Sequence, residues 1–438
     1  MKSFAFIVGT LLTALSLPGA PAAGDSARPN IVLIVADDLG YGDVGCFGCR
    51  DIPTPNLDQL AHDGVRFSQA YAYNVCSPTR ASLITGRYAE RSGIRTVLMG
   101  ESVPQFAKAI TVAQVLHQAG YVTGLVGKWH LGYEGDVLPT RMGYEEFFGF
   151  HGGKIDYFKH TDSTQKNGTP EGKHDLWEGN TEIFRQGYST DLFTERARQF
   201  IRDHAQAPFF LELTYNAPHY ATHNGVYQAP AAYLQRFGVE HQPENTRGGY
   251  AAMVSCMDDG IGRVLAELTA HQLDAKTLVV FISDNGAEDA GSNRPFSGGK
   301  HSNKEGGIRV PWIARWPGVI PPATVRSDMG HVMDLMPTLL SVAHITPPAE
   351  CQFDGTNIWS AFAGKALVAD RAICFPPNAI REGRWKLIGN KLFDLAADPA
   401  EQSDVAAQHA EVCAQLSRQR TVWQQAMKIP MVSRPTNQ

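Results

Sequence analysis

The sequence has no excess of basic residues and, beyond its N-terminus, no apolar run long enough to cross a membrane. Its 438 residues include 39 Lys and Arg against 44 Asp and Glu, which gives a formal net charge of -5. A chain with this balance has no overall electrostatic attraction to nucleic acid or to an anionic membrane surface. We therefore expect no nucleic-acid partner and no stable membrane insertion, and any site for an anion must be local.

The N-terminal apolar run belongs to residues 1–23, which combine one Lys, an apolar stretch and the small-residue pattern Ala20-Pro21-Ala22. Thr, Ser, Gly and Pro interrupt the stretch, which falls short of the roughly 20 apolar residues that a spanning helix needs. These features favour a cleaved signal peptide over a membrane anchor. We therefore expect an exported protein, either periplasmic or secreted.

Cysteine is scarce, and the seven cysteines are Cys46, Cys49, Cys76, Cys256, Cys351, Cys374 and Cys413. An odd number in an oxidising compartment leaves at least one without an intramolecular partner, and Cys76 is the candidate. Cys46 and Cys49 have the C-x-x-C spacing, but the chain has no second such pair and no thioredoxin-like context. This favours a disulfide or two ordinary thiols over a redox or zinc site.

Short apolar runs alternate with helical patterns over most of the chain. The run at 30–40, NIVLIVADDLG, is continuous, as is typical of a strand buried on both faces of a parallel sheet. Further strand patterns lie at 121–127, 208–215, 277–286 and 310–316, and helical patterns lie at 54–67, 111–120, 189–204 and 250–270. This alternation predicts a layered α/β domain that extends to about residue 345.

The pattern changes after this point. Residues 379–399 predict two short strands around a Gly-Asn turn, and residues 400–416 predict a helix. We therefore expect a large domain at 24–345 followed by a small α+β subdomain at 346–438. Within the large domain, the stretch 160–187 is expected to be an irregular loop.

Two of the strand patterns end in a pair of oxygen-bearing side chains. Asp37 and Asp38 follow the first run, and Asp284 and Asn285 follow the run that begins at 277. In open parallel sheets ligands collect beyond the carboxyl ends of the strands, so both pairs are expected at one edge. Oxygen ligands without His or Cys favour calcium or magnesium over zinc. The alternative is that each pair caps a following turn or helix.

Cys76 directly precedes Ser-Pro-Thr-Arg, a sequence that is typical of a helix start. Ser77 can cap the helix, and Pro78 suits the first turn, where a missing N–H costs little. Cys76 and Arg80 would then lie at a helix N-terminus, whose unpaired N–H groups suit an anion. A thiol there would also be acidified, so one hypothesis is a plain cysteine nucleophile.

Three loops that follow strand patterns carry basic residues. These are Lys128 and His130, then His219, and then Lys300, His301 and Lys304. A single Lys of this kind is most often a solvated surface charge, and a single His is most often a bonded structural group. Three Gly- or Pro-containing basic loops at one sheet edge instead favour a pocket for an oxyanion.

Taken in order, these motifs resemble those of the formylglycine-dependent sulfatases, members of the alkaline phosphatase superfamily. The stretch CSPTRASLITGRY has the family's C-x-P-x-R signature, and the resemblance continues through ADDLGYGDVGCFG, TPNLDQLAHDGVRF, GKWHLG, APH, SDNGAE, GGKHSNKEGGIRVP and REGRWKLI. It covers nearly the whole chain after residue 23. It implies a large mixed, mainly parallel sheet flanked by helices, with a small C-terminal α+β subdomain.

The resemblance also implies a set of site residues. Cys76 would be oxidised to formylglycine by a formylglycine-generating or anaerobic sulfatase-maturating enzyme, and the hydrated aldehyde would supply the attacking hydroxyl. One Ca2+ ion would be bound by residue 76 together with Asp37, Asp38, Asp284 and Asn285. The sulfate would lie among Arg80, Lys128, His130, His219 and Lys300.

Within this set, Arg80 and Lys128 would hold the sulfate, and Asp284 is a plausible base for the attack. His219 and Lys300 would protonate the departing oxygen, and His130 would take the second hydroxyl proton. Lys304 replaces what is often an aromatic residue in the family. The segment 148–158, FGFHGGKIDYF, departs from relatives that place a serine near the sulfate, so no contact is transferred to it.

The expected activity is hydrolysis of a sulfate monoester, with a sulfated carbohydrate preferred over a small aryl sulfate as the substrate. One alternative is a phosphoesterase of the same superfamily, although these usually have a Ser or Thr nucleophile and His-rich two-metal sites. Another is an inactive sulfoglycan-binding protein, although Cys76, Arg80 and the expected ligands are all present. Five further residues are expected either to line a sugar-binding cleft or to be scattered over the surface, and the sequence leaves both alternatives open. They are Tyr157, Trp177, Tyr220, His223 and Tyr227.

Overall fold

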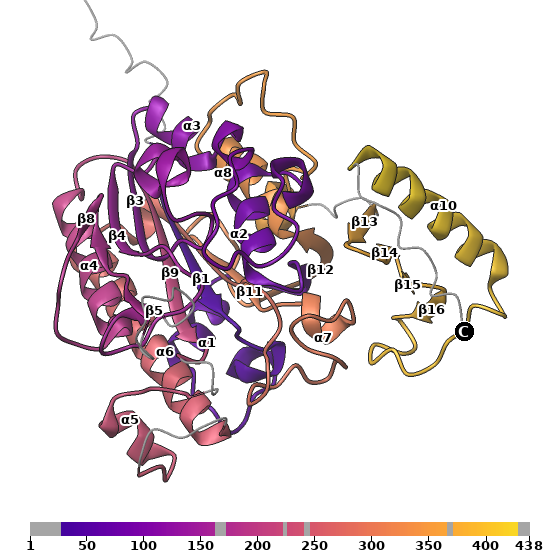
Figure 1. The fold of residues 1–438 in the computed structure, drawn as a ribbon, viewed down its shortest axis with the longest axis horizontal. Coiled ribbons are helices and arrows are strands. Elements are labelled where there is room, and N and C mark those ends of the chain that lie inside the picture. The colour runs from indigo at the N-terminus through magenta and orange to yellow at the C-terminus, as the bar shows by residue number, and fades with distance from the viewer. Residues whose placement is uncertain (1–27, 163–171, 222–225, 241–245, 366–370, 428–438) are drawn as a thin grey trace, which may run out of the picture.

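The computed structural model describes residues 28–162, 172–221, 226–240, 246–365 and 371–427 (Figure 1). The signal peptide expected at 1–23 and the candidate His223 lie outside these residues. Within the described ranges, no helix has both the length and the apolar character needed to cross a membrane.

A ten-stranded mixed sheet forms the centre of the larger part of the molecule (Figure 1). Five strands in the middle, β10, β1, β9, β3 and β4, run parallel to one another, and β11 runs antiparallel to both of its neighbours. In spatial order the strands are β12 (Thr324–His331), β2 (Val65–Tyr71), β11 (Trp312–Arg315), β10 (Thr277–Ser283), β1 (Asn30–Asp37), β9 (Phe209–Pro218), β3 (Val122–Lys128), β4 (Glu146–Phe150), β7 (Trp177–Glu178) and β8 (Thr181–Glu182). The expected mainly parallel sheet is therefore confirmed.

Helices cover both faces of this sheet, because its central strands are apolar on both sides. In β1, Ile31 and Leu33 pack into one core, and Val32 and Ile34 pack into the other. The first core is covered by α2 (Cys76–Thr85), α3 (Val112–Gln118), α8 (Leu335–Val342) and α9 (Trp359–Phe362). The second is covered by α1 (Pro55–His62), α4 (Ser189–Asp203), α5 (Ala231–Arg236) and α6 (Arg247–Ala270).

The C-terminal part is a four-stranded antiparallel sheet with one helix packed on it (Figure 1). Its elements are β13 (Ala372–Phe375), β14 (Ala379–Glu382), β15 (Trp385–Ile388), β16 (Lys391–Asp394) and α10 (Ala410–Ala426). The expected Gly-Asn turn joins β15 to β16, with Gly389 at a φ of 60°. The stretch 379–399 holds three strands, so the prediction of two was wrong by one.

The helix predicted at 400–416 is present, but its start was predicted too early, because α10 begins at Ala410. Side chains bind the backbone that a longer helix would have used. Asp398 Oδ2 accepts from the amides of Gln402 and Ser403, and Asp404 Oδ1 accepts from the amide of Ala406. These local bonds compete with helical ones and hold the segment in turns.

A small helix of the large domain, α7 (Glu305–Ile308), is tied to the C-terminal sheet by a buried charge cluster. Lys386 Nζ on β15 lies 2.8 Å from Glu305 Oε1 and 2.9 Å from Glu401 Oε1. Asn303, just before α7, donates to the carbonyl of Pro376 over 2.9 Å. The C-terminal sheet therefore holds the end of the loop that carries Lys300.

The stretch 160–187 is more ordered than the irregular loop that was expected. Its described residues include β7 and β8 at the sheet edge, and a second pair, β5 (Thr161–Asp162) with β6 (Lys173–His174). These strands have only two residues each, so hydrophobic periodicity could not reveal them.

Candidate active site

The side chains that end β1 and β10 meet at one edge of the sheet. The two strands are parallel neighbours, so their last residues leave the sheet side by side. Asn285 Nδ2 donates to Asp38 Oδ1 over 2.6 Å, and the Asp38 amide donates to Asp284 Oδ1 over 3.2 Å. These residues and Asp37 are at most 3% exposed. The first helical turn after β1 is capped by Gly40 rather than by either Asp, so the pairs form a cluster instead of caps.

This cluster has the charge and the unpaired oxygen atoms that a hard cation requires. Oδ1 of Asp37 and Oδ1 of Asn285 are buried and have no hydrogen-bond partner among the described residues. Ligand atoms of Asp37, Cys76 and Asp284 lie within 4.8 Å of one another. Buried oxygens without partners are costly, and a divalent cation would satisfy them. The residues present therefore fit the expected Ca2+ site.

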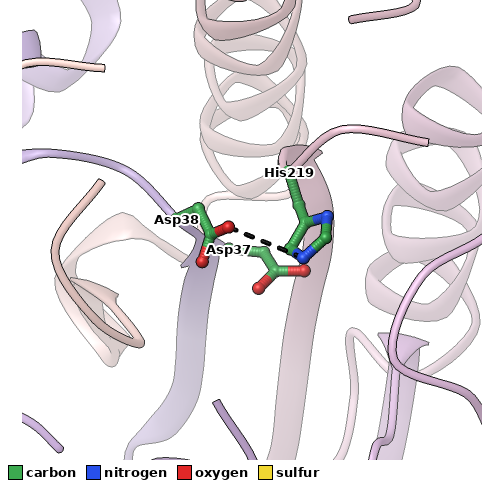
Figure 2. Close-up of side chains that lie close together, drawn as sticks. All are labelled: Asp37, Asp38 and His219. Carbon is green, nitrogen blue, oxygen red and sulfur yellow. Dashed lines mark ion pairs between the residues drawn. The ribbon is translucent and has the colours of Figure 1, made fainter. Parts of the chain in front are cut away.

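The electrostatics of Asp37 support the same conclusion. Burial raises the pKa of this carboxyl well above its usual value, Lys128 opposes the rise, and the charge of Asp284 adds to it. Holding several buried carboxylates close together is therefore energetically unfavourable, and a bound cation would offset this cost. His219 also approaches the cluster, because its ring nitrogen, Asp37 and Asp38 lie within 4.8 Å of one another (Figure 2). The ring of His219 thus lies next to the ligands expected from the sequence, all of which supply oxygen atoms.

Cys76 is the first residue of α2 and is 2% exposed. The helix start is where the sequence predicts it, but Val75 is the N-cap and no side chain caps the helix. The Ser77 hydroxyl instead accepts a hydrogen bond from the Leu98 amide over 3.1 Å. The expectation that Ser77 caps α2 was therefore wrong, because its position inside the first turn directs the hydroxyl to another loop.

The thiol of Cys76 is not acidified. Burial raises its pKa above the usual value, although Lys128 and Lys300 act in the opposite direction. Desolvation therefore outweighs the two lysines, and a raised pKa does not favour a plain cysteine nucleophile. The other six cysteines are free as well, so Cys46 and Cys49 are ordinary thiols in this structure.

Arg80 and Lys128 lie beside the acidic cluster, and both are buried. Arg80 Nη2 is 2.9 Å from Asp284 Oδ2, and Arg80 Nη1 donates to the carbonyl oxygen of Lys128 over 3.1 Å. Lys128 Nζ is 2.6 Å from Asp37 Oδ2, and neither side chain is exposed to solvent. Arg80 and Lys128 are thus each paired with a carboxylate of the acidic cluster.

His130 follows β3 and is oriented by a backbone bond. Its Nε2–H donates to the Leu98 carbonyl over 2.9 Å, so Nδ1 is left as an acceptor. Nδ1 is buried and has no hydrogen-bond partner within the described part of the chain. Burial, together with Lys128, lowers the pKa of His130 well below its usual value, so the ring is neutral at neutral pH. A neutral ring with an unoccupied acceptor nitrogen is suited to take a proton.

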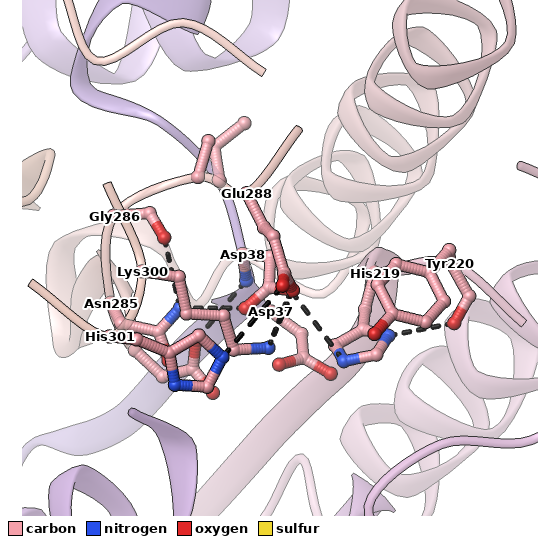
Figure 3. Close-up of polar contacts among 12 residues, drawn as sticks. Asp37, Asp38, His219, Tyr220, Asn285, Gly286, Glu288, Lys300 and His301 are labelled. Atoms are coloured by element: carbon pink, nitrogen blue, oxygen red, sulfur yellow. Dashed lines mark hydrogen bonds and ion pairs between the residues drawn. The ribbon is translucent and has the colours of Figure 1, made fainter. Parts of the chain in front are cut away.

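His219 and Lys300 lie on two sides of Asp38 (Figure 3). Lys300 Nζ is 2.8 Å from Asp38 Oδ2, and His219 Nε2 is 3.5 Å from the same atom. His219 Nδ1–H donates to the Tyr220 carbonyl over 2.7 Å. Burial and the nearby lysines lower the pKa of His219 well below its usual value. Burial opposes the charge of Lys300, but the combined effect of Asp38, Cys76, Asp37 and Glu288 outweighs burial, so the pKa of Lys300 is well above its usual value.

A cavity of about 260 Å³ opens onto these groups. Cys76, His130, His219 and Lys300 line it, and the other lining residues are Val97, Leu98, Met99, Gly153, Lys154, Tyr220, Glu288 and His301. The structure therefore brings the predicted residues to one site, either in the wall of this cavity or in the acidic cluster directly behind it. A small pocket lined by cations is suited to bind a compact anion.

Two charged wall residues were missed by the sequence reasoning, namely Lys154 and Glu288. Lys154 lies in the segment from which no contact was transferred, and Glu288 is the last residue of the SDNGAE motif but was given no role. His301 reaches the mouth of the cavity, where its Nε2 is 3.7 Å from Glu288 Oε1. Lys304 does not line the cavity and instead precedes α7 as its N-cap residue.

Of the four described aromatic residues that were considered for a sugar cleft, only Tyr220 lines this cavity. Tyr157 and Tyr227 are at most 2% exposed, and the Tyr157 hydroxyl donates to the His219 carbonyl over 2.8 Å. Trp177 is half-buried in β7, where its Nε1–H donates to Asp175. These three residues support the fold around the site rather than a substrate surface.

Comparisons with known proteins agree with this geometry. The model of the family described as Sulfatase matches residues 29–345. The chain is 35% identical to N-acetylgalactosamine-6-sulfatase of Canis lupus familiaris over 83% of its own length and 72% of that protein. It is 32% identical to arylsulfatase A of Homo sapiens, over 85% of this chain and 78% of the relative. Among solved structures, Ps i-CgsB in complex with k-i-k-neocarrahexaose matches with a TM-score of 0.82 and 33% identity, covering 90% of this chain and 92% of that one.

Proposed function

The chain belongs to the sulfatase family of the alkaline phosphatase superfamily and is a sulfuric ester hydrolase, and from this we propose that its substrates are sulfated carbohydrates. Two relatives support a carbohydrate. One is named for a sulfated amino sugar, and the other was solved with a carrageenan-type hexasaccharide. The cavity combines Lys154, Lys300 and His219 with the ring of Tyr220, which is consistent with a sugar sulfate.

The observation that carries the mechanism is the position of Cys76 between the acidic cluster and the basic wall of the cavity. We propose that Cys76 is converted to formylglycine by a maturating enzyme. The hydrated aldehyde would supply one hydroxyl for the attack on sulfur and a second through which sulfate is released. The raised pKa of the thiol supports this proposal, because an unmodified Cys76 would be a poor nucleophile.

We propose that Asp37, Asp38, Asp284 and Asn285 hold a calcium ion together with residue 76. The unpaired buried oxygens of Asp37 and Asn285 support this assignment. A bound Ca2+ supplies positive charge that polarises the sulfate group and neutralises its oxygens. The presence of an all-oxygen carboxylate and amide set at one sheet edge also argues against the His-rich two-metal site of the related phosphoesterases.

The remaining residues would bind sulfate and move protons. Arg80 and Lys128 would neutralise the non-bridging oxygens, and the unoccupied Nδ1 of His130 would take the proton of the second hydroxyl. Lys300 keeps its proton and would supply it on the leaving-group side. His219 is neutral in the free chain and would gain a proton at Nε2 when an anion occupies the pocket, since a nearby negative charge raises its pKa.

The substrate class is tested by measuring sulfate release from protein made in a host that has a maturating enzyme. The panel contains sulfated saccharides, aryl sulfates, and phosphate esters of the same alcohols. We expect the saccharide sulfates to have the highest kcat/KM. Turnover of aryl sulfates alone would contradict the carbohydrate proposal, and faster release of phosphate than of sulfate would favour a phosphoesterase.

The position of Gly153 allows a sharp test of His130. A Cβ built on Gly153 would lie 2.7 Å from His130 Nε2, which bonds to the Leu98 carbonyl. Gly153→Ala should therefore displace the ring and lower kcat by up to about 100-fold, because a small misplacement of a reacting group has a large effect on rate. Gly330→Ala is the control, since its nearest neighbour atom would be at an ordinary 3.4 Å. Equal kcat values for the two variants would contradict the role of His130.

Metal dependence is tested by thermal unfolding, which does not require turnover. Adding Ca2+ at about 100 times its Kd to chelator-treated protein should raise the free energy of unfolding by about 2.7 kcal/mol. Asn285→Ala should reduce this stabilisation by removing one ligand. Asp289→Asn, which changes an exposed carboxylate on the same loop, should retain it. A Tm that does not respond to Ca2+ or Mg2+ would rule out a cation at this cluster.

Export of the chain is part of the same proposal. The signal-like sequence at 1–23 supports it. Expression with and without residues 1–23, followed by fractionation of the cells, tests it directly.

A further inference from the structure

Lys154 lines the cavity and is only 8% exposed, yet the mechanism above assigns it no role. Its position is fixed by the loop that follows β4. The Asp175 carboxylate accepts hydrogen bonds from the amides of His151 and Gly152, over 3.1 Å and 2.8 Å. Gly153 then packs against His130. The backbone on which Lys154 stands is therefore held by buried contacts, and its side chain is directed into the site.

The ammonium group of Lys154 differs from the other cations of the site in having no anionic partner. Lys128 is paired with Asp37 at 2.6 Å, and Lys300 is paired with Asp38 at 2.8 Å. Lys154 Nζ lies 4.5 Å from the centre of the Tyr220 ring, and within the described part of the chain Lys154 forms no ion pair and no hydrogen bond. The carboxylates of Asp162 and Glu288 act on it only from beyond ion-pair distance. A nearly buried charge without a partner is costly, so its retention at the cavity wall indicates an external anion.

The contacts of Lys154 place this anion on the leaving-group side of the site. Lys154 Nζ lies over the ring of Tyr220, the residue that follows His219 in the chain. Tyr220 also lies on the His219 side of the site, away from Lys300 (Figure 3). The Lys154 ammonium therefore faces the part of the substrate that remains after sulfate departs.

We propose that Lys154 and Tyr220 form a subsite for a second anionic group of the substrate, a sulfate ester or carboxylate next to the sulfate that is cleaved. This inference rests on the proposed function, and it narrows the substrate class to glycans with at least two negative charges close together. The ring of Tyr220 restricts the ammonium through a cation–π contact, and the incoming anion supplies the missing charge-assisted hydrogen bond. Burial, with a contribution from Lys300, lowers the pKa of Lys154 to about 8, so the group is still mainly protonated at neutral pH.

The test compares matched substrates in the mature enzyme. The substrates are N-acetylgalactosamine 6-sulfate, the same sugar with a second sulfate, and the same monosulfated sugar linked to a uronic acid. We expect the wild type to prefer one or both dianionic substrates. Lys154→Met should lower that preference, expressed as a ratio of kcat/KM values, by about 10- to 100-fold. The second sulfate and the uronic acid distinguish the two possible sources of the anion.

The matched control is Lys159→Met, which removes an exposed lysine of the same segment and should leave the preference within about twofold of the wild type, because exposed charges contribute little. Lys154→Arg keeps the charge and should recover most of the preference, which separates recognition from a folding defect. Equal losses on all three substrates would overturn the inference, since Lys154 would then act on the cleaved sulfate. A wild type without preference for a second anion would overturn it as well.

A binding measurement separates failure of this inference from failure of the proposed function. In Cys76→Ala protein, which cannot turn over, calorimetry gives Kd for the monosulfated and disulfated sugars with and without Lys154→Met. Loss of the Kd difference in the Lys154 variant supports the subsite even if the mature enzyme releases no sulfate from any panel member. The same Kd ratio in both proteins overturns it even if sulfatase activity is found.

Discussion

Replacement of Cys76 by alanine is expected to lower kcat/KM for sulfate release by at least about 10,000-fold, because it removes the nucleophile from an otherwise intact site. The side chain is small and buried at the start of α2, where alanine is a favourable helix residue. The paired contacts of Lys128 with Asp37 and of Arg80 with Asp284 do not involve the sulfur. The variant should therefore fold and still bind substrate.

Two measurements accompany this result. Cys413→Ala changes a partly exposed cysteine of α10 and should leave turnover unchanged. Mass spectrometry of the tryptic peptide that spans residues 67–80 should show an aldehyde at residue 76 in active wild-type protein. Full activity of protein whose residue 76 is an intact thiol would contradict the formylglycine proposal, and so would substantial activity in Cys76→Ala.

The second large effect is expected on stability, from Lys386→Met. Lys386 is not exposed to solvent, and its Nζ contacts both Glu305 and Glu401. Its removal leaves Glu401 without its cation and Glu305 with its arginine partners, the nearer of which is Arg309 at 3.0 Å from Glu305 Oε2. Breaking a buried ion pair by removing one partner typically costs about 3–5 kcal/mol. Because Glu305 follows the loop of Lys300 by only a few residues, we also expect kcat to fall. Urea unfolding measures the first effect, and sulfate release measures the second.

Lys391→Met is the matched control for this experiment. Lys391 lies on the neighbouring strand β16 and is exposed, so its loss should change the free energy of unfolding by less than about 0.5 kcal/mol. If the two variants unfold at the same urea concentration, the buried charge cluster does not join the C-terminal sheet to the large domain in the way that its geometry indicates.

The site was easier to predict from the sequence than the elements around it. Asp37 and Asp284 directly follow apolar runs, so their location at strand ends follows from the burial pattern alone. The order of the strands depends on long-range pairing, which no local pattern contains, and it was not predicted. The family resemblance implied only a large mixed, mainly parallel sheet. Motif order along the chain thus supplied information that hydrophobic periodicity lacks.

The residues that were missed owe their roles to contacts with distant parts of the chain. Lys386 lies in WKLI, where local sequence does not distinguish it from an exposed strand lysine, and only the folded chain places it beside Glu305. The local sequence likewise does not distinguish Lys154 from an exposed lysine, and only the folded loop places it beside Tyr220. The wrong cap at Ser77 and the wrong start of α10 have a related cause. A small polar side chain can form hydrogen bonds with several backbone groups, and the sequence alone does not show which of these bonds forms.

The burial of Cys76 also constrains when the proposed conversion to formylglycine could take place. A side chain that is 2% exposed in the folded chain is out of reach of another protein's catalytic centre, so the proposed modifying enzyme would have to meet this segment before it folds. Chemical maturation and folding are then in competition: a polypeptide that folds first would trap an unconverted thiol. The yield of active enzyme should consequently depend on how early the maturating enzyme encounters the nascent chain, and less on how much of it is present later.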